Sequence, residues 1–392
     1  MKDQLTITKT FRIVTLALIC IGIITFIAGI LSDSTRTWAG YLITNYYFLS
    51  LAIGGFFFLV LQTITQSGWS AAFKRVPEAM MAYIPFAAIF FLLLYFGLHD
   101  LYHWSHDDAV AGDELLQHKS TFLNVPFFFL RMILYFSLWI FFVVKLRKFS
   151  KMEDMMDPAD QNSIMTLFNK NELYSKIFIF ILAITFSFSA FDWMMSIEPH
   201  WYSTIYALKN LVAAFFHGVS ILFLIIFILY KKGYFPFMND YHLHDFSRYI
   251  FMLSIVWGYF WFAQFMIIWY GNIPEETIYY YERWQGHWEA LFFLEIGINW
   301  AIPFLVLLPV KTSRNVNILV GVIILLIIGQ YIDLFVQVIP GTTGILIFGW
   351  IEAGIFLGYA GLFALVVATS LSKSRLTPSN HPYLEESLNH KF

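Results

Sequence analysis

The sequence predicts an all-α integral membrane protein whose chain crosses the bilayer ten times. Of its 392 residues, 59% are hydrophobic and only 13% are charged, whereas a soluble domain carries roughly a quarter charged residues. The apolar residues fall in continuous runs of about 20, the length that a helix needs to cross a bilayer. Continuous runs favour a helical bundle over a β-barrel, whose strands are short and alternate in polarity. The net charge of −2 gives no basis for binding nucleic acid.

Hydropathy along the chain places five spans in each half of the sequence. The first five are expected at Phe11–Leu31, Ala39–Ile64, Pro77–Leu98, Pro126–Val144 and Lys176–Met195. The second five are expected at Tyr206–Tyr230, Arg248–Tyr270, Trp288–Leu308, Asn315–Ile339 and Ile345–Leu371. No small-residue cleavage site follows the first span, so we expect it to be kept as an anchor. Residues 1–371 are then one polytopic membrane domain, and residues 372–392 a polar cytoplasmic tail that we expect to be extended.

The distribution of Lys and Arg predicts that both ends of the chain are cytoplasmic. With ten spans, both termini and the segments after even-numbered spans share one side, and that side holds 19 of the 24 basic residues. Such an excess marks the cytoplasmic side of a membrane protein. The basic residues left on the outer side are Arg36, Lys119, Arg131, Lys209 and Arg283.

The sequence carries no redox or nucleotide-binding motif. Its single cysteine, Cys20, lies in the first span, so it has neither a C-x-x-C-H haem motif nor the four cysteines of an iron–sulfur cluster. Only His217 lies deep in a span, whereas a haem held by two histidines needs a second one. His99, His103 and His106 have helical spacing near the outer surface, but nothing in their pattern forces a closed metal site. We therefore expect no cofactor, metal or catalytic residue in this chain.

Several polar side chains lie within the expected spans, where a charge costs several kcal/mol unless it is paired, protonated or hydrated. Spacings of three or four residues put side chains on one helix face, which pairs Gln330 with Asp333 and Glu295 with Asn299. Such faces should point into the bundle, and the acids crowd its outer half, as expected for a quinol pocket or for half of a proton path. The candidate proton-path residues are Asp192, His217, Glu295, Asn299, Gln330, Asp333 and Glu352.

Each candidate also has a purely structural interpretation. Asp192 is close enough to the outer boundary to be an interfacial residue, and Glu352 is also explained as a protonated acid held by a neighbouring helix. A lone buried histidine such as His217 is more often a packing residue than a relay. Glu295 has the stronger case, because Pro303 in the same span frees a backbone carbonyl, and such helix breaks often line cavities.

Two connections stand out for their composition. On the outer side, residues 270–288 contain four tyrosines and two tryptophans, which is more than interfacial anchoring requires. An exposed aromatic surface of this kind indicates a docked partner. On the cytoplasmic side, residues 147–174 are polar and rich in methionine, and we expect a long loop there.

Long stretches of the sequence resemble one family of membrane subunits. HKSTFLNVPFFFLRM, at residues 118–132, is similar to the loop-and-helix signature of the polysulfide reductase/NrfD class. The other stretches are SGWSAAFKRVPEAM (67–80), FDWMMSIEPHWYSTIYA (191–207), WFAQFMIIWYGNIPEETIYY (261–280) and YLEESLNHKF (383–392). Together they resemble the F-type subunits of bacterial alternative complex III, a quinol:cytochrome c oxidoreductase. The resemblance covers nearly the whole chain, although the connection at Ser32–Trp38 is shorter than in relatives that carry a charged insert.

This resemblance implies two four-helix bundles, spans two to five and six to nine, flanked by the first and last spans. It implies a bacterial inner (plasma) membrane complex in which iron–sulfur and c-type haem subunits carry the electrons. A paralogous C-type membrane subunit, to which the quinol site is attributed, would be another partner, as would lipids and menaquinol or a similar quinol. For the F-type subunit it implies a supporting role, with proton conduction proposed.

The sequence therefore predicts a membrane subunit, without cofactors of its own, of a respiratory complex that oxidises quinol and passes electrons to cytochrome c or a terminal oxidase. We expect a polar route through the candidate residues from the midplane of the membrane to its outer surface. Three alternatives stay open: a quinol-binding subunit in its own right, a purely structural scaffold, and a secondary transporter.

Overall fold

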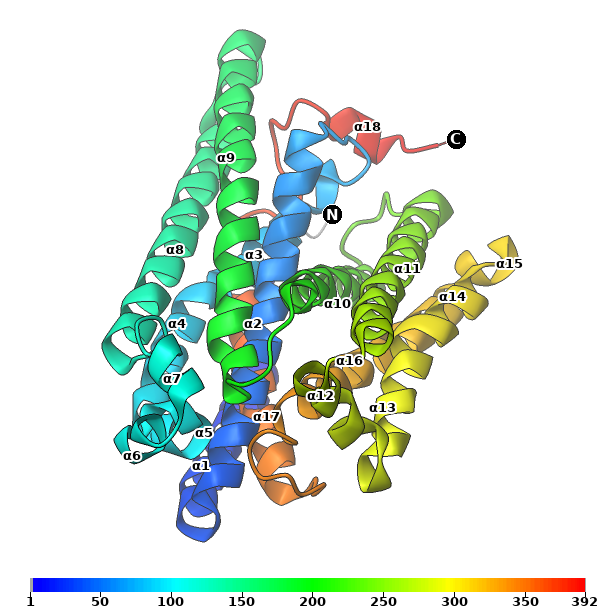
Figure 1. Ribbon diagram of the computed structural model, residues 1–392. Helices are drawn as coiled ribbons and strands as arrows, with labels where there is room; N and C mark the ends of the chain where they lie inside the picture. The colour runs from blue at the N-terminus through cyan, green and yellow to red at the C-terminus, as the bar shows by residue number, and fades with distance from the viewer. Residues whose placement is uncertain (1–2, 392) are drawn as a thin grey trace.

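The computed structural model describes residues 3–391 and confirms the predicted fold class (Figure 1). This part of the chain contains ten helical segments that are long and apolar enough to cross a membrane. No strand forms within it, apart from an isolated antiparallel bridge between Gln4 and Arg375. The protein is thus an all-α, multi-pass membrane protein.

Eight spans are continuous helices and two are broken. The continuous ones are α1 (Lys9–Ser32), α2 (Ser34–Ile64), α8 (Val125–Met155), α9 (Gln161–Trp193), α10 (Thr204–Lys231), α11 (Asp240–Gly271), α16 (Val316–Val338) and α17 (Trp350–Leu371). The third span consists of η1 (Ala71–Phe73), α3 (Arg75–Met80), η2 (Met81–Tyr83), α4 (Ile84–Leu92), η3 (Leu93–Gly97) and α5 (Leu98–Leu101). The eighth consists of η6 (Gly286–Trp288), α13 (Glu289–Ile296), the π-helical η7 (Gly297–Ala301) and α14 (Ile302–Leu307).

Short helices occupy the connections. They are η4 (His103–Ser105), α6 (Asp107–Ala111), α7 (Glu114–Lys119), η5 (Met195–Ile197), α12 (Pro274–Trp284), α15 (Val310–Ser313) and α18 (Leu384–Leu388). Proline accounts for two of the breaks inside spans, because it lacks the N–H that an α-helix needs at each interior residue. Pro85 follows η2 and Pro303 follows η7, and each lies in the first turn of the next helical segment.

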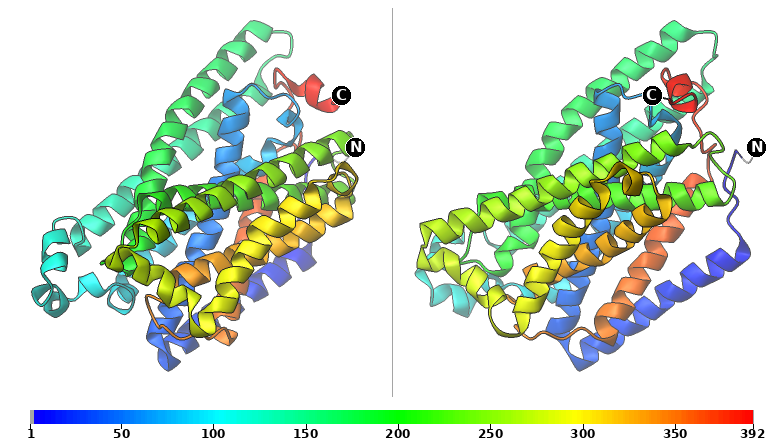
Figure 2. Two further views of the ribbon diagram at one scale, coloured as in Figure 1. Left: turned by 45° about the vertical axis from the view of Figure 1, so that its right-hand side comes forward. Right: turned by 90° about the vertical axis from the view of Figure 1, so that its right-hand side faces the viewer.

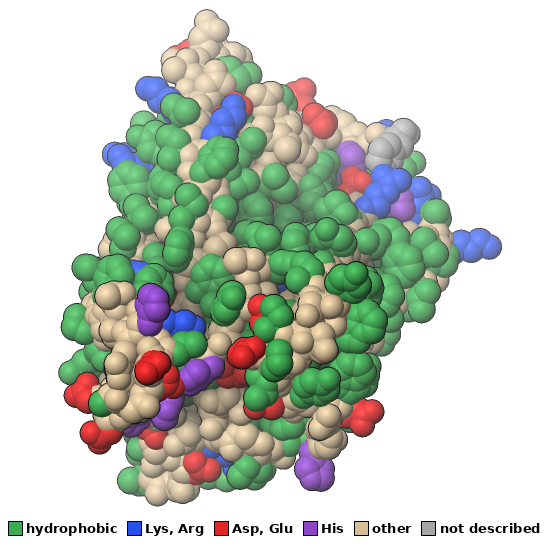
Figure 3. Space-filling model, viewed as in Figure 1, with side chains coloured by type: hydrophobic (Ala, Val, Ile, Leu, Met, Phe, Trp, Pro, Cys, Tyr) green, Lys and Arg blue, Asp and Glu red, His purple; other side chains and the backbone are tan. Residues whose placement is uncertain are grey.

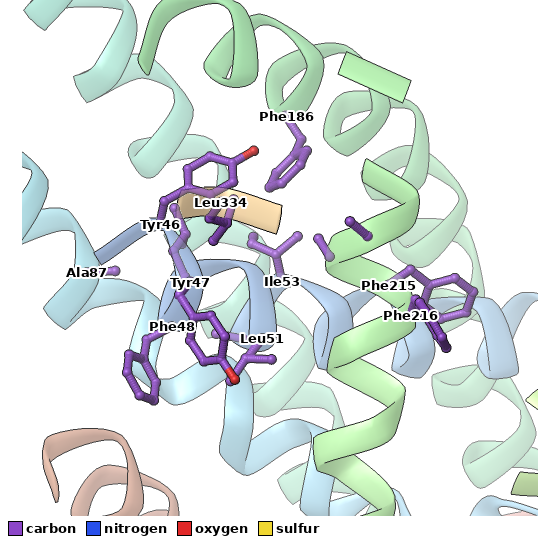
Figure 4. Packing of buried hydrophobic residues seen from close by; sticks show 14 of the residues in the cluster. Tyr46, Tyr47, Phe48, Leu51, Ile53, Ala87, Phe186, Phe215, Phe216 and Leu334 are labelled. Carbon is purple, nitrogen blue, oxygen red and sulfur yellow. The ribbon is translucent and has the colours of Figure 1, made fainter. Parts of the chain in front are cut away.

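The two four-helix bundles are present, and α2 and α10 join them. In the first bundle the third span, α4 included, packs with α2, α8 and α9; in the second, α10, α11, α13–α14 and α16 pack together. Helix α10 also lies against α2 and α9, and α1 lies along α17 at the edge of the molecule. Figure 4 shows the central position of α2, whose Tyr46, Phe48 and Ile53 lie among side chains of neighbouring helices. Helix α2 is buried on nearly all sides, and most of its side chains are apolar.

Both ends of the described chain lie at the same end of the molecule (Figures 1 and 2). The Leu376 N–H donates to the Asp3 carbonyl oxygen at 2.8 Å, and the Gln4 side-chain amide donates to the Ser372 carbonyl oxygen at 2.6 Å. Figure 3 shows Lys and Arg gathered mostly towards this end, while Asp, Glu and His gather around the opposite one. This arrangement is the one expected if both termini are cytoplasmic.

Two expectations about the cytoplasmic side are wrong. Residues 147–174 are not a long loop, because α8 and α9 extend beyond the apolar region and leave only residues 156–160 between them. The tail is not extended throughout, because residues 384–388 form α18. This helix is docked on the third span: Ser387 Oγ donates to the Trp69 carbonyl oxygen at 2.7 Å. Hydropathy reports neither helical structure beyond the apolar region nor long-range hydrogen bonds, so it missed both segments.

The two bundles approach most closely where glycines face each other. A Cβ atom added to Gly54 of α2 would overlap backbone atoms of α10, and one added to Gly218 of α10 would overlap backbone atoms of α2. Gly22 of α1 and Gly358 of α17 face each other in the same way. Close backbone packing matters here because the hydrophobic effect supplies no force between helices in lipid.

The variant Gly218→Ala should therefore destabilise the protein by about 1–3 kcal/mol, the usual cost of overpacking. The clash involves the backbone of α2, which cannot yield as a flexible side chain would. Gly321→Ala on α16 is the matched control, because Gly321 is exposed and has open space where its Cβ would lie. Thermal unfolding in detergent measures the melting temperatures of the two variants. Equal melting temperatures would contradict the close contact between α2 and α10.

Candidate functional site

The four acids predicted to lie inside the membrane are all buried in the protein, and none faces lipid. Asp192, Glu295, Asp333 and Glu352 are each exposed by 2% or less. Each meets a basic side chain from another helix, which compensates a charge that hydrocarbon would penalise. The structure brings Glu295 and Asp333 together, but it keeps Asp192 and Glu352 in two separate groups.

Asp192, near the end of α9, forms a balanced ion pair in the first bundle. Its carboxylate accepts hydrogen bonds from Arg131 of α8, from Nη2 at 2.7 Å and from Nε at 2.9 Å, the two-pronged geometry in which arginine binds most strongly. The Tyr135 hydroxyl donates to the same carboxylate at 2.9 Å. The Asp192 carboxylate is therefore fully paired, which favours its structural interpretation as a tie between α8 and α9.

Glu352 forms a second balanced pair at the start of α17. Its carboxylate accepts hydrogen bonds from Arg36 of α2, from Nε at 2.7 Å and from Nη2 at 2.8 Å, and from the Gly349 backbone N–H at 2.7 Å. This cap explains why α17 begins at Trp350, and not at Ile345 as expected. A carboxylate in the first turn also interacts favourably with the helix dipole.

The third group lies in the second bundle and has one cation for two acids. Nζ of Lys209 on α10 is 2.7 Å from Oδ1 of Asp333 on α16 and 4.0 Å from Oε1 of Glu295 on α13. The other carboxylate oxygens, Oδ2 of Asp333 and Oε2 of Glu295, have no hydrogen-bond partner among residues 3–391. This group is thus unbalanced, unlike the pairs at Asp192 and Glu352.

Neutral donors hold the two acids of this group in place. The Trp261 indole N–H of α11 donates to Oε1 of Glu295 at 2.7 Å, and the Gln337 amide donates to Oδ1 of Asp333 at 2.9 Å. Asn210 in turn donates to Oε1 of Gln337 at 3.2 Å. These contacts join α11 to α13 and α10 to α16, and they leave one oxygen of each acid unused.

The break before Pro303 turns Asn299 into the bundle. The N–H of Ile302 donates to the carbonyl oxygen of Gly297, five residues earlier, so the chain makes one wide π turn. From this turn Nδ2 of Asn299 donates to the Gly329 carbonyl oxygen of α16 at 3.1 Å. The predicted helix break is confirmed, and it places an amide one turn from Glu295.

His217 meets this amide from α10. Its Nε2 lies 3.1 Å from Oδ1 of Asn299, and its Nδ1 lies 2.7 Å from the Ala213 carbonyl oxygen. A neutral imidazole has one N–H and can donate to only one of these oxygens. With the Asn299 amide in this orientation, only a protonated imidazole can donate to both oxygens. The two contacts are therefore compatible with a packing role for His217 and with a role as proton acceptor.

Gln330 lies outside these contacts, although it shares a helix face with Asp333. Its amide donates to Ser50 Oγ of α2 at 2.6 Å, and Ser50 donates to the Tyr47 carbonyl oxygen at 2.7 Å. Gln330 therefore links α16 to α2. Its Oε1 has no hydrogen-bond partner in the described part of the chain.

Outwards from Asp333, polar contacts continue to Arg283 and Glu198. Nη2 of Arg283 donates to the Gln337 carbonyl oxygen at 3.2 Å and pairs with Glu198, whose side chain is 17% exposed. The Arg283 guanidinium also stacks on the Tyr279 ring, 3.5 Å from its centroid. Burial alone would lower the pKa of Arg283, but the electrostatic influence of Tyr279 and of the Glu198 carboxylate raises it overall, so this side chain stays a cation.

Towards the cytoplasm, aromatic side chains follow the polar ones. Phe223, six residues after His217 on α10, contacts Phe246 with 5.3 Å between ring centroids, and Phe246 contacts Phe58 at 6.3 Å. All three rings are buried. The polar contacts described above therefore extend from His217 towards the outer surface and not towards the cytoplasm.

Sequence reasoning missed the partners of the acids, although the charge distribution contained a signal for them. Every basic residue assigned to the outer side makes a specific contact: Arg36 with Glu352, Arg131 with Asp192, Lys209 with Asp333, Arg283 with Glu198, and Lys119 with the Pro199 carbonyl oxygen. The five basic residues that do not lie on the cytoplasmic side are thus bound by acids or carbonyl oxygens inside the protein.

Half of the tyrosine and tryptophan side chains in the outer connection are buried and half are exposed. The connection folds into α12, where Tyr279 and Tyr280 are buried, and Trp288 is buried just after it. Tyr279 stacks on Trp201 with 3.9 Å between ring centroids. The aromatic surface available to a partner is therefore smaller than the composition of this segment indicates.

Within residues 3–391, no group of three or more His, Cys, Asp or Glu side chains could hold a metal ion. Asp100, beside the outer histidines, accepts hydrogen bonds from the hydroxyls of Ser34 and Thr35, both at 3.0 Å. No protein-family model matches the sequence, and no curated protein is significantly similar to it. The structural support for a functional proposal therefore comes from the geometry of the site.

Removing Arg131 should leave Asp192 as an uncompensated buried charge, so Arg131→Met should lower the free energy of unfolding by about 3–5 kcal/mol. The double variant Arg131→Met/Asp192→Leu removes both charges and should recover most of this loss. Lys170→Met, at an exposed position, is the control and should behave as the wild type. Thermal unfolding in detergent decides, and a double variant no more stable than Arg131→Met would show that the charge of Asp192 is not the cause.

Proposed function

We propose that this chain is a membrane subunit of a respiratory quinol-oxidising complex, and that it conducts protons to the outer side through the site around Lys209. The observation that carries the proposal is the charge imbalance at this site. Lys209 faces both Glu295 and Asp333, and each acid keeps one oxygen without a partner among the described residues. Such a site is suited to holding and passing on a proton.

The charges of the site explain why a proton would be held there. If both acids were ionised, the group would carry a net charge of −1, and a charge in the bilayer costs about 2.5–3.5 kcal/mol or more. One proton shared by Glu295 and Asp333 removes this charge. Lys209 faces both carboxylates and compensates whichever one is ionised.

The neighbouring contacts give the direction of transfer. His217 and Asn299 lie at the inner end, and the contacts from Asp333 through Gln337 and Arg283 reach Glu198 at the outer end. In this proposal the buried rings of Phe223, Phe246 and Phe58 close the inner end of the route. In this proposal a proton released inside the membrane leaves outwards.

The proposed route is narrower than the sequence predicted. Asp192 and Glu352 each have a dedicated arginine and a further donor, so both carboxylates are fully compensated by fixed partners. We assign both to the stability of the bundle. The route consists of Glu295, Asp333 and His217, with Asn299 positioning the imidazole.

The respiratory part of the proposal rests on the resemblance to F-type subunits and to the polysulfide reductase/NrfD class. Because the sequence carries no haem or iron–sulfur motif, electrons would pass through partner subunits with iron–sulfur clusters and c-type haems. Quinol oxidation releases protons as well as electrons, so a complex of this kind needs an exit for protons on the outer side of a bacterial inner membrane.

A second candidate function, quinol binding by this chain itself, is favoured by a cavity on the outer side. The cavity has a volume of about 560 Å³ and lies between α11 and α12, with Phe265, Tyr280 and Trp284 in its lining. Phe265 stacks on Trp261 with 5.8 Å between ring centroids, and Trp261 donates to Glu295. The stacked rings of Phe265 and Trp261 thus connect the lining of this cavity to the acid.

Replacing Glu295 by Gln, or Asp333 by Asn, leaves one acid for Lys209 and removes the need for a shared proton. We expect kcat of the assembled complex to fall by about 10²-fold or more, the usual contribution of a positioned proton donor or acceptor. Proton release should fall in parallel, and the KM for quinol should stay unchanged. Cytochrome c reduction and a pH indicator in vesicles measure the two quantities.

Glu289→Gln is the matched control, because Glu289 lies on α13 like Glu295 but is exposed; it should keep wild-type turnover. Unchanged turnover and proton release in both test variants, in a fully assembled complex, would eliminate the route. Loss of assembly alone would indicate a scaffold, and a raised KM with kcat retained would favour the quinol site. Substrate uptake by the chain alone in vesicles would indicate a transporter.

A further inference from the structure

A groove at the cytoplasmic end of α8 and α17 combines an apolar floor with basic side chains. Two cavities of about 380 and 570 Å³ adjoin there and share Ala82, Arg147 and Lys373 in their linings. Ala82 of η2 and Phe86 of α4 line the first cavity and supply its apolar floor. We call this the α8–α17 groove.

The face of α8 that lines the groove changes from apolar to basic towards the cytoplasm. Val144, Arg147, Lys148, Lys151 and Met152 line it, and their spacing puts all of them on one face of the helix. Val144 lies deeper in the membrane than the three cations, and Met152 follows Lys151 at the cytoplasmic end. Such a gradient matches the acyl chains and the headgroup region of one lipid leaflet.

The face of α17 that lines the groove repeats this gradient. Leu362 and Val366 lie deeper, Ser370 follows, and Lys373 lies at the cytoplasmic end. The Arg147 guanidinium donates to the Ser370 hydroxyl at 2.8 Å, which holds this cation where the apolar and basic parts meet. The groove thus has matching walls contributed by two helices that are far apart in the sequence.

The charge of the groove is one-sided. Neither cavity is lined by an Asp or Glu from the described part of the chain. The acids of the last turns of α8, Glu153 and Asp154, point to the third span instead, where they pair with Lys74 and Arg75. The side of α8 that faces the groove is therefore left with positive charge alone.

We propose that the α8–α17 groove binds an anionic phospholipid of the cytoplasmic leaflet. Its phosphate would contact Arg147, Lys148, Lys151 and Lys373, and its acyl chains would lie along the apolar residues of α8 and α17. Basic pockets between membrane helices on the cytoplasmic side recognise acidic headgroups in this way. The binding would tie the fourth span to the last one, and it does not depend on the function proposed for the Lys209 site.

The test uses the full-length protein in the assembly in which it is purified, with phosphatidylglycerol and phosphatidylcholine as probes in native mass spectrometry. The triple variant Lys148→Gln/Lys151→Gln/Lys373→Gln removes three exposed cations and keeps Arg147 with its hydrogen bond. Because a basic side chain near the surface contributes roughly fivefold to the binding of anionic lipid, phosphatidylglycerol should bind about 100-fold more weakly. Binding of phosphatidylcholine should not change.

The matched control is Lys170→Gln/Lys311→Gln/Arg314→Gln, which removes the same charge from exposed cytoplasmic positions outside the groove. It should keep wild-type binding of phosphatidylglycerol. Equal losses in the two triple variants, or no preference of the wild type for phosphatidylglycerol, would overturn the proposal. So would displacement of the lipid by free inorganic phosphate, or by an acidic peptide from a partner subunit, because the groove would then bind those and not a lipid.

Discussion

The low dielectric of the membrane interior requires a partner for every buried charge, and this constraint organises the whole structure. At Asp192 and Glu352 the requirement is met by one arginine for one acid, with further hydrogen bonds to the same carboxylates. At Lys209 it is met by one lysine for two acids. The balanced pairs hold helices together, whereas we propose that the unbalanced group exchanges a proton.

Basic residues serve three purposes in this chain, and their position distinguishes them. Those on the cytoplasmic side orient the chain, and at the α8–α17 groove four of them face a lipid-sized cavity without an acid. Those on the outer side are internal partners of acids or carbonyls. The orientation of the chain and its internal chemistry are thus encoded by the same residue types.

The sequence was sufficient to predict the parts of the structure that depend on hydropathy. The ten spans and the break before Pro303 are confirmed, since apolar length and proline chemistry determine them. The grouping into two bundles was expected only from the family resemblance, and the packing of the helices agrees with it. The burial of Glu295 and Asp333 also follows from the cost of charge in lipid. The cap at Gly349 and the docking of α18 were missed, because hydrogen bonds set both and hydropathy does not report them. The partner of each acid was missed as well, because ion pairs such as Arg36 with Glu352 join positions 316 residues apart.

The central claim is that Glu295 and Asp333 share one proton because Lys209 neutralises only one of them. Infrared spectroscopy of the purified protein at neutral pH tests it directly, through the carbonyl stretch of a protonated carboxylic acid. We predict such a band in the wild type and its loss in either Glu295→Gln or Asp333→Asn, because each variant leaves one acid paired with Lys209. A band that survives either substitution, or no band in the wild type, would contradict the shared proton.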